Sequence, residues 1–272
     1  MLFSESNFPL IMGILNITPD SFYSKSCIDY NNLNIDKFKY ADIVDIGCES
    51  SRPGSSPISN KKELSRLLKF INYNQLSNQY LSIDTYKPEI ARYALENGFF
   101  MINDIQSGGR DYLMMDLAVE FDCPIIFMHM KGEPNSMQKK PFYEDVIGDI
   151  MSFFENKLKI AASIGIKSEN IILDPGIGFG KRIQDNYNII RNLNKIKQFN
   201  HRILVGLSRK SFLSVNSDGP ESRLTSTIAA TVLAIQNGAD ILRVHDVEET
   251  YKLIMTMNKF NDENLHREVN EV

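Results

Sequence analysis

Short apolar runs alternate along the chain with longer stretches in which apolar residues recur every three or four positions. A short run bounded by turn residues is typical of a buried strand, and the longer repeat is typical of an amphipathic helix. The pattern predicts eight strands, at residues 10–15, 42–47, 80–83, 99–102, 124–128, 170–173, 202–206 and 240–244. It also predicts helices at 35–41, 61–73, 88–96, 111–121, 142–164, 185–196 and 221–236, and a last helix after Asp246.

Eight strand–helix alternations in 272 residues favour a single (β/α)8 TIM barrel of the α/β class. An open, doubly wound sheet fits less well, because no G-x-G-x-x-G motif follows the first strand. No linker-like segment divides the chain. We therefore expect residues 1–272 to form one barrel domain, with a polar C-terminal tail from about residue 261.

With 43% hydrophobic and 24% charged residues, the chain has the composition of a globular protein. Its formal net charge of −4 does not attract nucleic acid, so a bound anion requires local positive charge. Cys27, Cys48 and Cys123 have no CxxC spacing, which favours neither a disulfide framework nor a zinc site. The apolar run at 8–15 is too short for a signal peptide or a membrane span. We expect a cytoplasmic protein that binds neither nucleic acid nor membrane.

Polar or charged residues close every predicted strand at its carboxyl end. They are Asn16, Asp45, Asp84, Asn103 with Asp104, His129, Asp174, Arg209 with Lys210, and Arg243 with His245. In a barrel of parallel strands these ends meet on one face, where the active sites of this fold lie. A single residue of this kind is most often a cap or a turn former, but recurrence at all eight strands points to a ligand site.

These residues offer two kinds of chemistry. Asp84, Asn103 and Asp174 provide acceptors and an amide, which suit a flat heterocycle rich in N–H groups. The cationic residues suit phosphate or pyrophosphate, and they are Arg52, Lys210, Arg243 and His245. Asn16, with the loop around Asp20, could supply oxygen ligands to Mg2+, which takes few protein oxygens when phosphate is present. Together they describe a nitrogen heterocycle that carries a pyrophosphate.

The sixth predicted strand runs into LDPGIGFGK at 173–181, an aspartate followed by a proline, three glycines and a lysine. Such glycine spacing lets backbone N–H groups approach a ligand closely. Taken alone, the stretch fits equally well a tight turn in which Asp174 caps the next helix.

Taken in order, these segments resemble those of the dihydropteroate synthases over the whole barrel. The matching segments are NITPDSF at 16–22, DIGCESSRPG at 45–54, IDT at 83–85, NDI at 103–105, MHMKG at 128–132, LDPGIGFGK at 173–181, GLSRKS at 206–211 and RVHD at 243–246. Each segment alone is weak evidence for this family, whereas all of them together, in the order in which the family has them, are highly specific evidence.

The resemblance implies a transferase of folate biosynthesis that joins 6-hydroxymethyl-7,8-dihydropterin pyrophosphate to p-aminobenzoate, forming 7,8-dihydropteroate and releasing pyrophosphate. It implies Mg2+ held at Asn16, a homodimer, and sulfonamides as inhibitors that compete with p-aminobenzoate. The resemblance, together with the chemistry, implies a dissociative, SN1-like substitution, because the aryl amine is a weak nucleophile and needs a strongly electrophilic pterin methylene cation.

The resemblance also implies roles for single residues. The residues expected to bind the pterin are Asp84, Asn103, Met128, Asp174, Phe179, Gly206 and Lys210. Those expected to bind the pyrophosphate are Asn16, Ser51, Arg52, Arg243 and His245. Those expected to line the p-aminobenzoate pocket are Phe22, Arg52, Pro53, Phe179 and Ser208. The expected catalytic residues are Asp84, Lys210 and Arg52, with the Asp84 carboxylate stabilising the cation.

The chain departs from the family at YSKS, 23–26, where the family continues with Ser-Asp-Gly-Gly. Loss of the paired glycines stiffens a loop that is expected to close over the site, which bears on p-aminobenzoate affinity.

Two alternative functions remain open. One is a pterin-type methyltransferase domain, which would lack the pyrophosphate residues; the other is a paralogue that binds pterin without turnover, which the altered loop favours.

Overall fold

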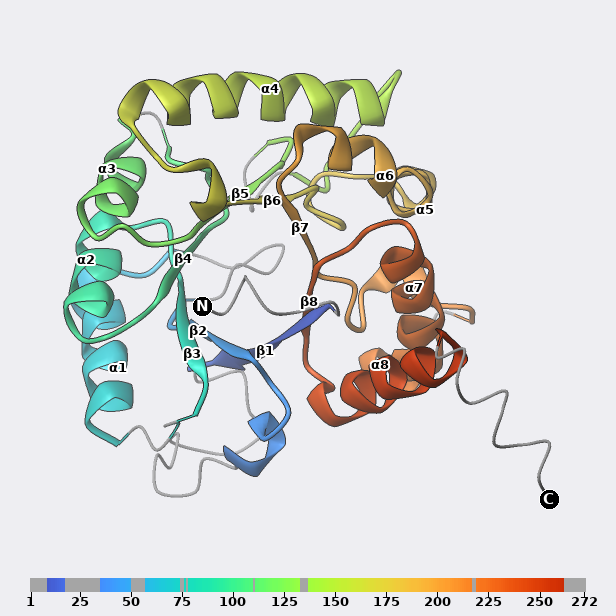
Figure 1. Cartoon of the computed structure of the whole chain (residues 1–272), viewed down its shortest axis with the longest axis horizontal. Coiled ribbons are helices and arrows are strands. Elements are labelled where there is room, and N and C mark those ends of the chain that lie inside the picture. Colours follow the sequence, from blue (N-terminus) through green and yellow to red (C-terminus); the bar gives the residue numbers. More distant parts are fainter. Residues whose placement is uncertain are drawn as a thin grey trace.

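The eight apolar runs form a closed barrel in the computed structural model, each strand parallel to the next and β8 paired with β1 (Figure 1). The strands are β1 (Leu10–Asn16), β2 (Ile43–Gly47), β3 (Tyr80–Asp84), β4 (Met101–Asp104), β5 (Ile125–Met128), β6 (Ile171–Asp174), β7 (Arg202–Val205) and β8 (Ile241–Val244). The structure describes residues 9–17, 35–49, 57–73, 76, 78–109, 111–132, 137–216 and 219–261. The prediction of a (β/α)8 TIM barrel is confirmed.

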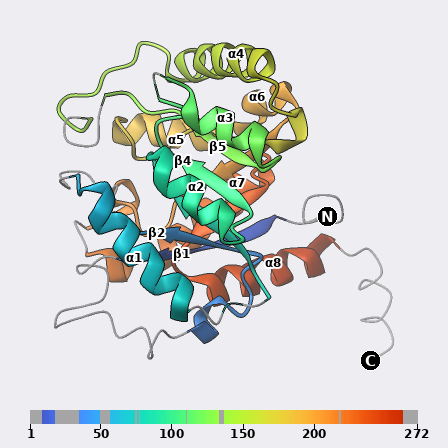
Figure 2. The same ribbon diagram turned by 90° about the vertical axis from the view of Figure 1, so that its left-hand side faces the viewer.

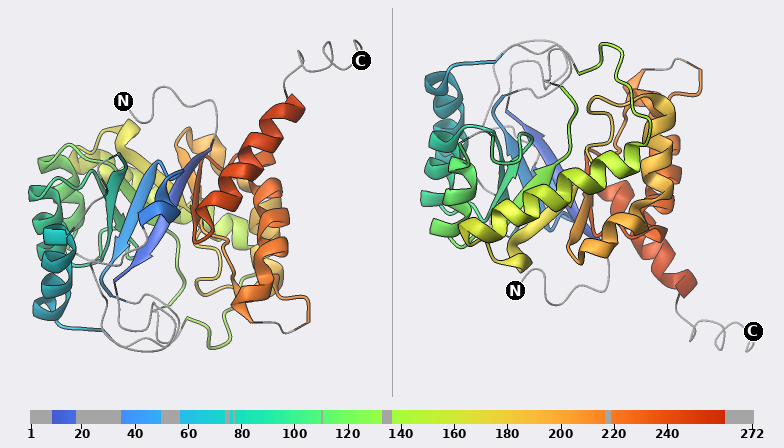
Figure 3. Two further views of the ribbon diagram at one scale, coloured as in Figure 1. Left: turned by 90° about the horizontal axis from the view of Figure 1, so that it is seen from below. Right: turned by 90° about the horizontal axis from the view of Figure 1, so that it is seen from above.

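Helices surround the barrel. They are α1 (Asn60–Tyr73), α2 (Pro88–Glu96), α3 (Leu113–Glu120), α4 (Val146–Ile164), α5 (Ile183–Arg191), α6 (Leu193–Ile196), α7 (Leu224–Gln236) and α8 (Val247–Asn261). Helices α1, α2 and α3 lie side by side along one flank (Figure 2), with α7 and α8 on the opposite flank and α4 crossing the outside obliquely (Figure 3). None of the helices in the described ranges is long and apolar enough to cross a membrane.

The interior of the barrel is filled by its own apolar cluster. Its buried members come from seven strands: Leu10, Met12, Ile43, Met101, Ile126, Ile172, Leu204 and Ile241. A second, larger cluster fills the space between the strands and the helices. The two clusters are separate because successive side chains of a strand point to opposite faces of the sheet.

The same alternation places polar side chains above the apolar filling. The residue two positions beyond each inner apolar residue also faces the interior, now nearer the carboxyl end of the strand. These residues are Asp45, Asn103, Met128, Asp174, Gly206 and Arg243, which follow Ile43, Met101, Ile126, Ile172, Leu204 and Ile241. The register then sets Asp84 beside Asn103, and Met128 beside Asp174.

Local capping moves the start of one helix from its predicted position. Helix α4 starts at Val146 rather than at residue 142, because the Asp145 side chain accepts a hydrogen bond from the Ile147 N–H at 3.1 Å. It ends at Ile164, as predicted, before Gly165, whose φ of 101° is in the left-handed region that glycine adopts readily.

Three predicted elements differ in the structure. The segment at 35–41 is only a short 3₁₀ helix, Ile35–Phe38, closed by bonds between residues three apart. The helix predicted at 185–196 is divided into α5 and α6 at Asn192, which has φ −119° and ψ 21°. The helix predicted at 221–236 begins as a 3₁₀ turn, Pro220–Arg223, before α7. Strands β4 and β6 are shifted toward the carboxyl side. Strand β4 runs from Met101 to Asp104 rather than over 99–102, and β6 runs from Ile171 to Asp174 rather than over 170–173.

The inner cluster gives a stability prediction. Replacing Leu204, which is fully buried, by alanine should lower the free energy of unfolding by about 2–5 kcal/mol, because a cavity is left in a filled interior. The matched change Leu113→Ala, at a side chain 46% exposed on α3, should cost less than about 1 kcal/mol. Urea unfolding of both variants measures the difference. Equal losses would contradict a tightly packed barrel interior.

Candidate active site

Arg243 bridges two carboxylates inside the barrel. Its Nε donates to Oδ2 of Asp45 and its Nη2 donates to Oδ2 of Asp84, both at 2.7 Å. The Nδ2 of Asn103 donates to the same oxygen of Asp45 at 2.8 Å. Strands β2, β3, β4 and β8 thereby contribute to one network, which we call the carboxylate cluster (Asp45, Asp84, Asn103 and Arg243).

Burial governs the electrostatics of this cluster. It raises the pKa of Asp84 to about 7, although the charge of Arg243 opposes that shift. Burial alone would lower the pKa of the Arg243 guanidinium, but the charges of Asp45 and Asp84 outweigh it and raise that pKa above its ordinary value. With both carboxylates ionised, the cluster carries one negative charge in excess. Oδ1 of Asp45 is also buried without a hydrogen-bond partner in the described part of the chain. The cluster can therefore accept N–H donors or positive charge from a ligand.

Asp174 and Lys210 form the neighbouring wall. Oδ1 of Asp174 accepts from the Gly176 N–H at 2.7 Å, and burial raises the pKa of the Asp174 carboxyl. Lys210 donates to the Ile177 carbonyl and lies 4.7 Å from the centre of the Phe179 ring. Burial lowers the pKa of Lys210 to about 8, against the charge of Asp174. This wall combines an acceptor, a cation and an aromatic face.

Two inward positions shape the space beside this wall. Met128 is buried at the end of β5, in register with Asp174. A Cβ on Gly206 would lie 3.9 Å from Nζ of Lys210 and equally far from Cβ of Arg243. Glycine at this position therefore leaves the space between the two cations open.

The glycine-rich loop after β6 packs backbone to backbone against the loop after β5. Gly176, Gly178 and Gly180 have φ values of 66°, 83° and 62°, in the left-handed region. A Cβ on Gly176 would lie only 1.9 Å from the His129 carbonyl oxygen, so a larger residue does not fit. Asp174 does cap this turn through its bond to the Gly176 N–H, and the same turn also brings Phe179 to the site.

At the ends of β7 and β8, Ser208 joins His245. The Ser208 Oγ accepts from the His245 backbone N–H at 3.2 Å and lies 3.0 Å from its Nδ1. Arg209 is turned away from the site, because its guanidinium forms a bidentate pair with Asp246, at 2.9 and 2.7 Å. Of the predicted Arg209–Lys210 pair, only Lys210 reaches the Gly-rich loop.

Four predicted site residues lie outside the described ranges: Phe22, Ser51, Arg52 and Pro53. The departure from the family at 23–26 and the predicted ligand at Asp20 also fall there. Asn16, at the end of β1, is described and half-buried. Its Oδ1 would lie only 3.0 Å from a Cβ on Gly47, so glycine at that position avoids a tight contact with this amide oxygen.

Two residues of the site, Asp45 and Lys181, were noted in the sequence but were given no binding or catalytic role there. Asp45 closes a strand, but only the barrel geometry shows that it holds both Arg243 and Asn103. Its position two residues beyond the inner residue Ile43 was the available signal. Lys181 ends the LDPGIGFGK segment, and its Nζ donates to three carbonyl oxygens, described below. No pattern in the sequence indicates that bonding.

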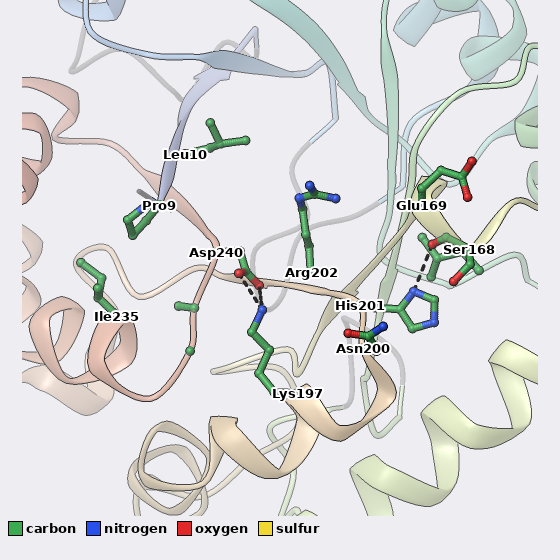
Figure 4. Close-up of a pocket in the computed structure, with 13 residues that line it drawn as sticks. Pro9, Leu10, Ser168, Glu169, Lys197, Asn200, His201, Arg202, Ile235 and Asp240 are labelled. Atoms are coloured by element: carbon green, nitrogen blue, oxygen red, sulfur yellow. Dashed lines mark hydrogen bonds and ion pairs between the residues drawn. The ribbon is translucent and has the colours of Figure 1, made fainter. Parts of the chain in front are cut away.

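A cavity of about 680 Å³ lies at the opposite end of the barrel (Figure 4). Its lining includes the first residues of β1, β6 and β7: Leu10, Ile171 and Arg202. Lys197 pairs with Asp240 there at 2.6 Å. The amino ends of the strands serve stability rather than chemistry in this fold, so we place the candidate site at the carboxylate cluster instead.

Comparison with known proteins agrees with the segments identified in the sequence. A family model described as pterin binding enzyme matches residues 12–245. A dihydropteroate synthase of Haemophilus influenzae is 38% identical to the chain over 257 residues, covering 92% of this chain and 93% of that protein.

Solved structures agree as well. A Yersinia pestis dihydropteroate synthase, crystallised with a sulfonamide drug, superposes with a TM-score of 0.85 at 35% identity, covering 93% of this chain and 94% of its own. A dihydropteroate synthase of Xanthomonas albilineans in complex with 7,8-dihydropteroate gives a TM-score of 0.82 at 30% identity, covering 94% of each chain. The chain therefore belongs to the pterin-binding enzymes and, among them, to the dihydropteroate synthase family of transferases.

Proposed function

We propose that the chain condenses 6-hydroxymethyl-7,8-dihydropterin pyrophosphate with p-aminobenzoate, releasing pyrophosphate and forming 7,8-dihydropteroate for folate biosynthesis. The observation that carries the proposal is the carboxylate cluster. It is a buried group on the barrel face where this fold conducts its chemistry, and it carries one excess negative charge when both carboxylates are ionised. A reaction that develops positive charge on a nitrogen heterocycle is the chemistry that such a cluster favours.

In this proposal the pterin lies flat between the cluster and the Lys210 wall. Asp84, Asn103 and Asp174 take up its N–H groups, while the Lys210 ammonium donates to its acceptor atoms. Met128 and Phe179 bound the ring as apolar walls, and Gly206 leaves room for it beside Lys210. The buried acceptor Oδ1 of Asp45 is available to the same ring.

We infer a dissociative substitution. The bond between the pterin methylene carbon and the pyrophosphate oxygen breaks, and its electron pair leaves with pyrophosphate. The amine nitrogen of p-aminobenzoate then forms the new C–N bond and loses a proton. The Asp84 carboxylate stabilises the intermediate cation, so the weakly basic amine needs no strong general base.

We place the leaving pyrophosphate and the second substrate in the outer part of the site. Two nitrogens of Arg243 already donate hydrogen bonds to carboxylates. We therefore assign most of the pyrophosphate binding to Ser51, Arg52 and His245, with Arg243 and Asn16 assisting. Phe22, Arg52 and Pro53 would hold p-aminobenzoate against Phe179 and Ser208.

Mg2+ belongs to the same proposal, and the residues present fit it. Asn16 offers an amide oxygen beside Gly47, where the lack of a side chain leaves room on that side. The described residues contain no group of three His, Cys, Asp or Glu side chains that could hold a metal ion by themselves. A site with few protein oxygens suits Mg2+ when a pyrophosphate completes its coordination. Bound there, the ion would supply charge neutralisation of the leaving pyrophosphate.

A homodimer and a cytoplasmic location are further inferences. Large apolar side chains on α7 and α8 are exposed, including Leu233 at 52% and Phe260 at 81%. Exposed apolar side chains on these two helices support an interface between copies of this chain. The cytoplasmic location stays a prediction from the cysteine content.

A pterin-binding paralogue without turnover is the alternative that a specific feature favours, namely YSKS at 23–26 in place of the paired glycines. A methyltransferase domain is disfavoured, because it has no use for residues that bind pyrophosphate.

The deciding experiment measures pyrophosphate release from dihydropterin pyrophosphate in the presence of Mg2+, with and without p-aminobenzoate. We expect release that depends on p-aminobenzoate and matches dihydropteroate formation mole for mole. Pterin binding with no coupled product would refute the synthase activity and establish the paralogue.

Asp84 gives a prediction for catalysis and its pH dependence. Asp84→Asn keeps the shape and an acceptor for Arg243 but removes the negative charge, so kcat should fall about 10²–10³-fold. Because the pKa of Asp84 is raised to about 7, kcat/KM for the dihydropterin substrate should decline in the wild type as pH falls below 7 and this carboxylate is protonated. The Asn variant should lack that decline. Identical pH profiles would exclude Asp84 as the group responsible.

Inhibition gives a second prediction. A sulfonamide should raise the KM for p-aminobenzoate and leave kcat unchanged, because both molecules present an aryl amine to one pocket. Steady-state rates at several p-aminobenzoate concentrations measure this. An inhibition constant that does not depend on p-aminobenzoate would count against a shared pocket.

A further inference from the structure

Side chains hold every backbone carbonyl of the loop from Gly176 to Phe179. The Gly178 oxygen accepts from Nε2 of Gln138 at 2.5 Å, and the Ile177 oxygen accepts from Lys210. The remaining two oxygens, of Gly176 and Phe179, accept from Nζ of Lys181 at 2.8 and 3.0 Å. Gly176 and Gly178 in this loop, and Gly180 directly after it, have left-handed φ values. The backbone therefore has little conformational preference of its own, and these bonds define its shape.

Lys181 makes a third bond that joins two loops. Its Nζ also donates to the His129 carbonyl oxygen at 3.1 Å, at the end of β5. The three N–H groups of the ammonium thereby meet three carbonyls, one after β5 and two after β6. Each hydrogen of the ammonium is satisfied by backbone alone.

Burying the Lys181 ammonium in this way costs free energy of folding. Lys181 is only 4% exposed, and no carboxylate lies within ion-pair distance of it in the described part of the chain. Burial lowers the pKa of Lys181 to about 7, although the charge of Asp174 opposes that shift. A buried cation without an ionic partner carries a desolvation penalty, which the bonds to the three carbonyls offset. The ammonium of Lys181 is therefore committed to holding these carbonyls in place.

One of the carbonyls that Lys181 holds belongs to Phe179, the residue of this loop whose ring faces the site. Phe179 is half-buried, its carbonyl is held by Lys181, and its ring lies 4.7 Å from Nζ of Lys210. A shift of the Phe179 backbone would move this ring within the wall that the proposed p-aminobenzoate pocket shares with the pterin.

We propose that Lys181 is a positioning residue for the second substrate: its ammonium fixes the Gly176–Phe179 backbone against His129 and so holds the Phe179 ring where the aryl amine binds. Lys181 itself touches neither substrate. The inference rests on the proposed synthase activity, and it adds a determinant of p-aminobenzoate affinity.

The test compares Lys181→Met with the wild type at saturating dihydropterin pyrophosphate. The variant should raise the KM for p-aminobenzoate about tenfold or more, because the Phe179 and His129 carbonyls lose a charged donor, and should change kcat less than threefold. Dihydropterin binding, measured by calorimetry, should weaken by a smaller factor than the KM for p-aminobenzoate rises, because Asp84, Asn103 and Asp174 also hold the pterin. Retained binding also shows that the variant is folded.

Two controls make the result specific. Lys131→Met removes a half-exposed ammonium from the same rim, where it donates to the Phe142 carbonyl, and should leave the KM for p-aminobenzoate within twofold. In a Phe179→Leu background, Lys181→Met should have little further effect on that KM, because the lysine acts through the ring. If Lys181 were merely structural, Lys181→Met would raise the KM for p-aminobenzoate by the same factor in the wild type and in the Phe179→Leu background.

The outcomes separate the two proposals. Turnover in the wild type with an unchanged KM in Lys181→Met, or with additive effects in the double variant, would overturn the positioning role alone. A wild type that binds pterin without p-aminobenzoate-dependent turnover would overturn the synthase activity and, with it, the role of Lys181.

Discussion

The guanidinium of Arg243 lies in the interior of a barrel, and the rest of the site depends on how that charge is compensated. Its partners Asp45 and Asp84 precede it by 198 and 159 residues in the chain. A charge buried this deeply is stable only with ionic partners and correct geometry, so the bonds fix the ends of β2, β3 and β8 relative to one another. Loss of the guanidinium would leave two carboxylates buried without compensation. Folding and the electrostatic character of the site are therefore consequences of the same contacts.

The site combines two ways of holding geometry. The carboxylate cluster is built from strand residues, whose positions follow from the register of the barrel. The opposite wall is a glycine-rich loop, whose backbone is held by side chains from outside the loop, chiefly Lys181 and Lys210. A strand platform gives the precision that charge stabilisation requires, while a loop allows backbone and ligand to approach closely.

The sequence was sufficient to predict the barrel, because inside and outside positions of a strand have opposite chemical requirements and repeat with period two. It was also sufficient to single out Asp84, Asn103 and Asp174, which interrupt apolar runs where a buried carboxylate or amide is otherwise costly. The partners of these residues were not predictable. The bond between Asp45 and Arg243 depends on closure of the barrel, and that of Lys181 to the Phe179 carbonyl depends on the path of a left-handed loop. Neither has a local sequence signal. The division of one predicted helix at Asn192 likewise arises from backbone angles that a hydrophobic repeat does not specify.

The apolar filling of the barrel below the carboxylate cluster has a consequence for the order of events. Met12, Met101 and Leu204 are fully buried, and they close the barrel beneath the polar layer. The candidate site is therefore closed from below, and ligands reach the polar layer from the carboxyl ends of the strands. Two ligands that stack in a site closed in this way must enter in sequence, the deeper one first, and a molecule made by joining them must leave with its deeper half trailing. A ligand held near the rim thus blocks both the arrival and the escape of whatever lies on the floor.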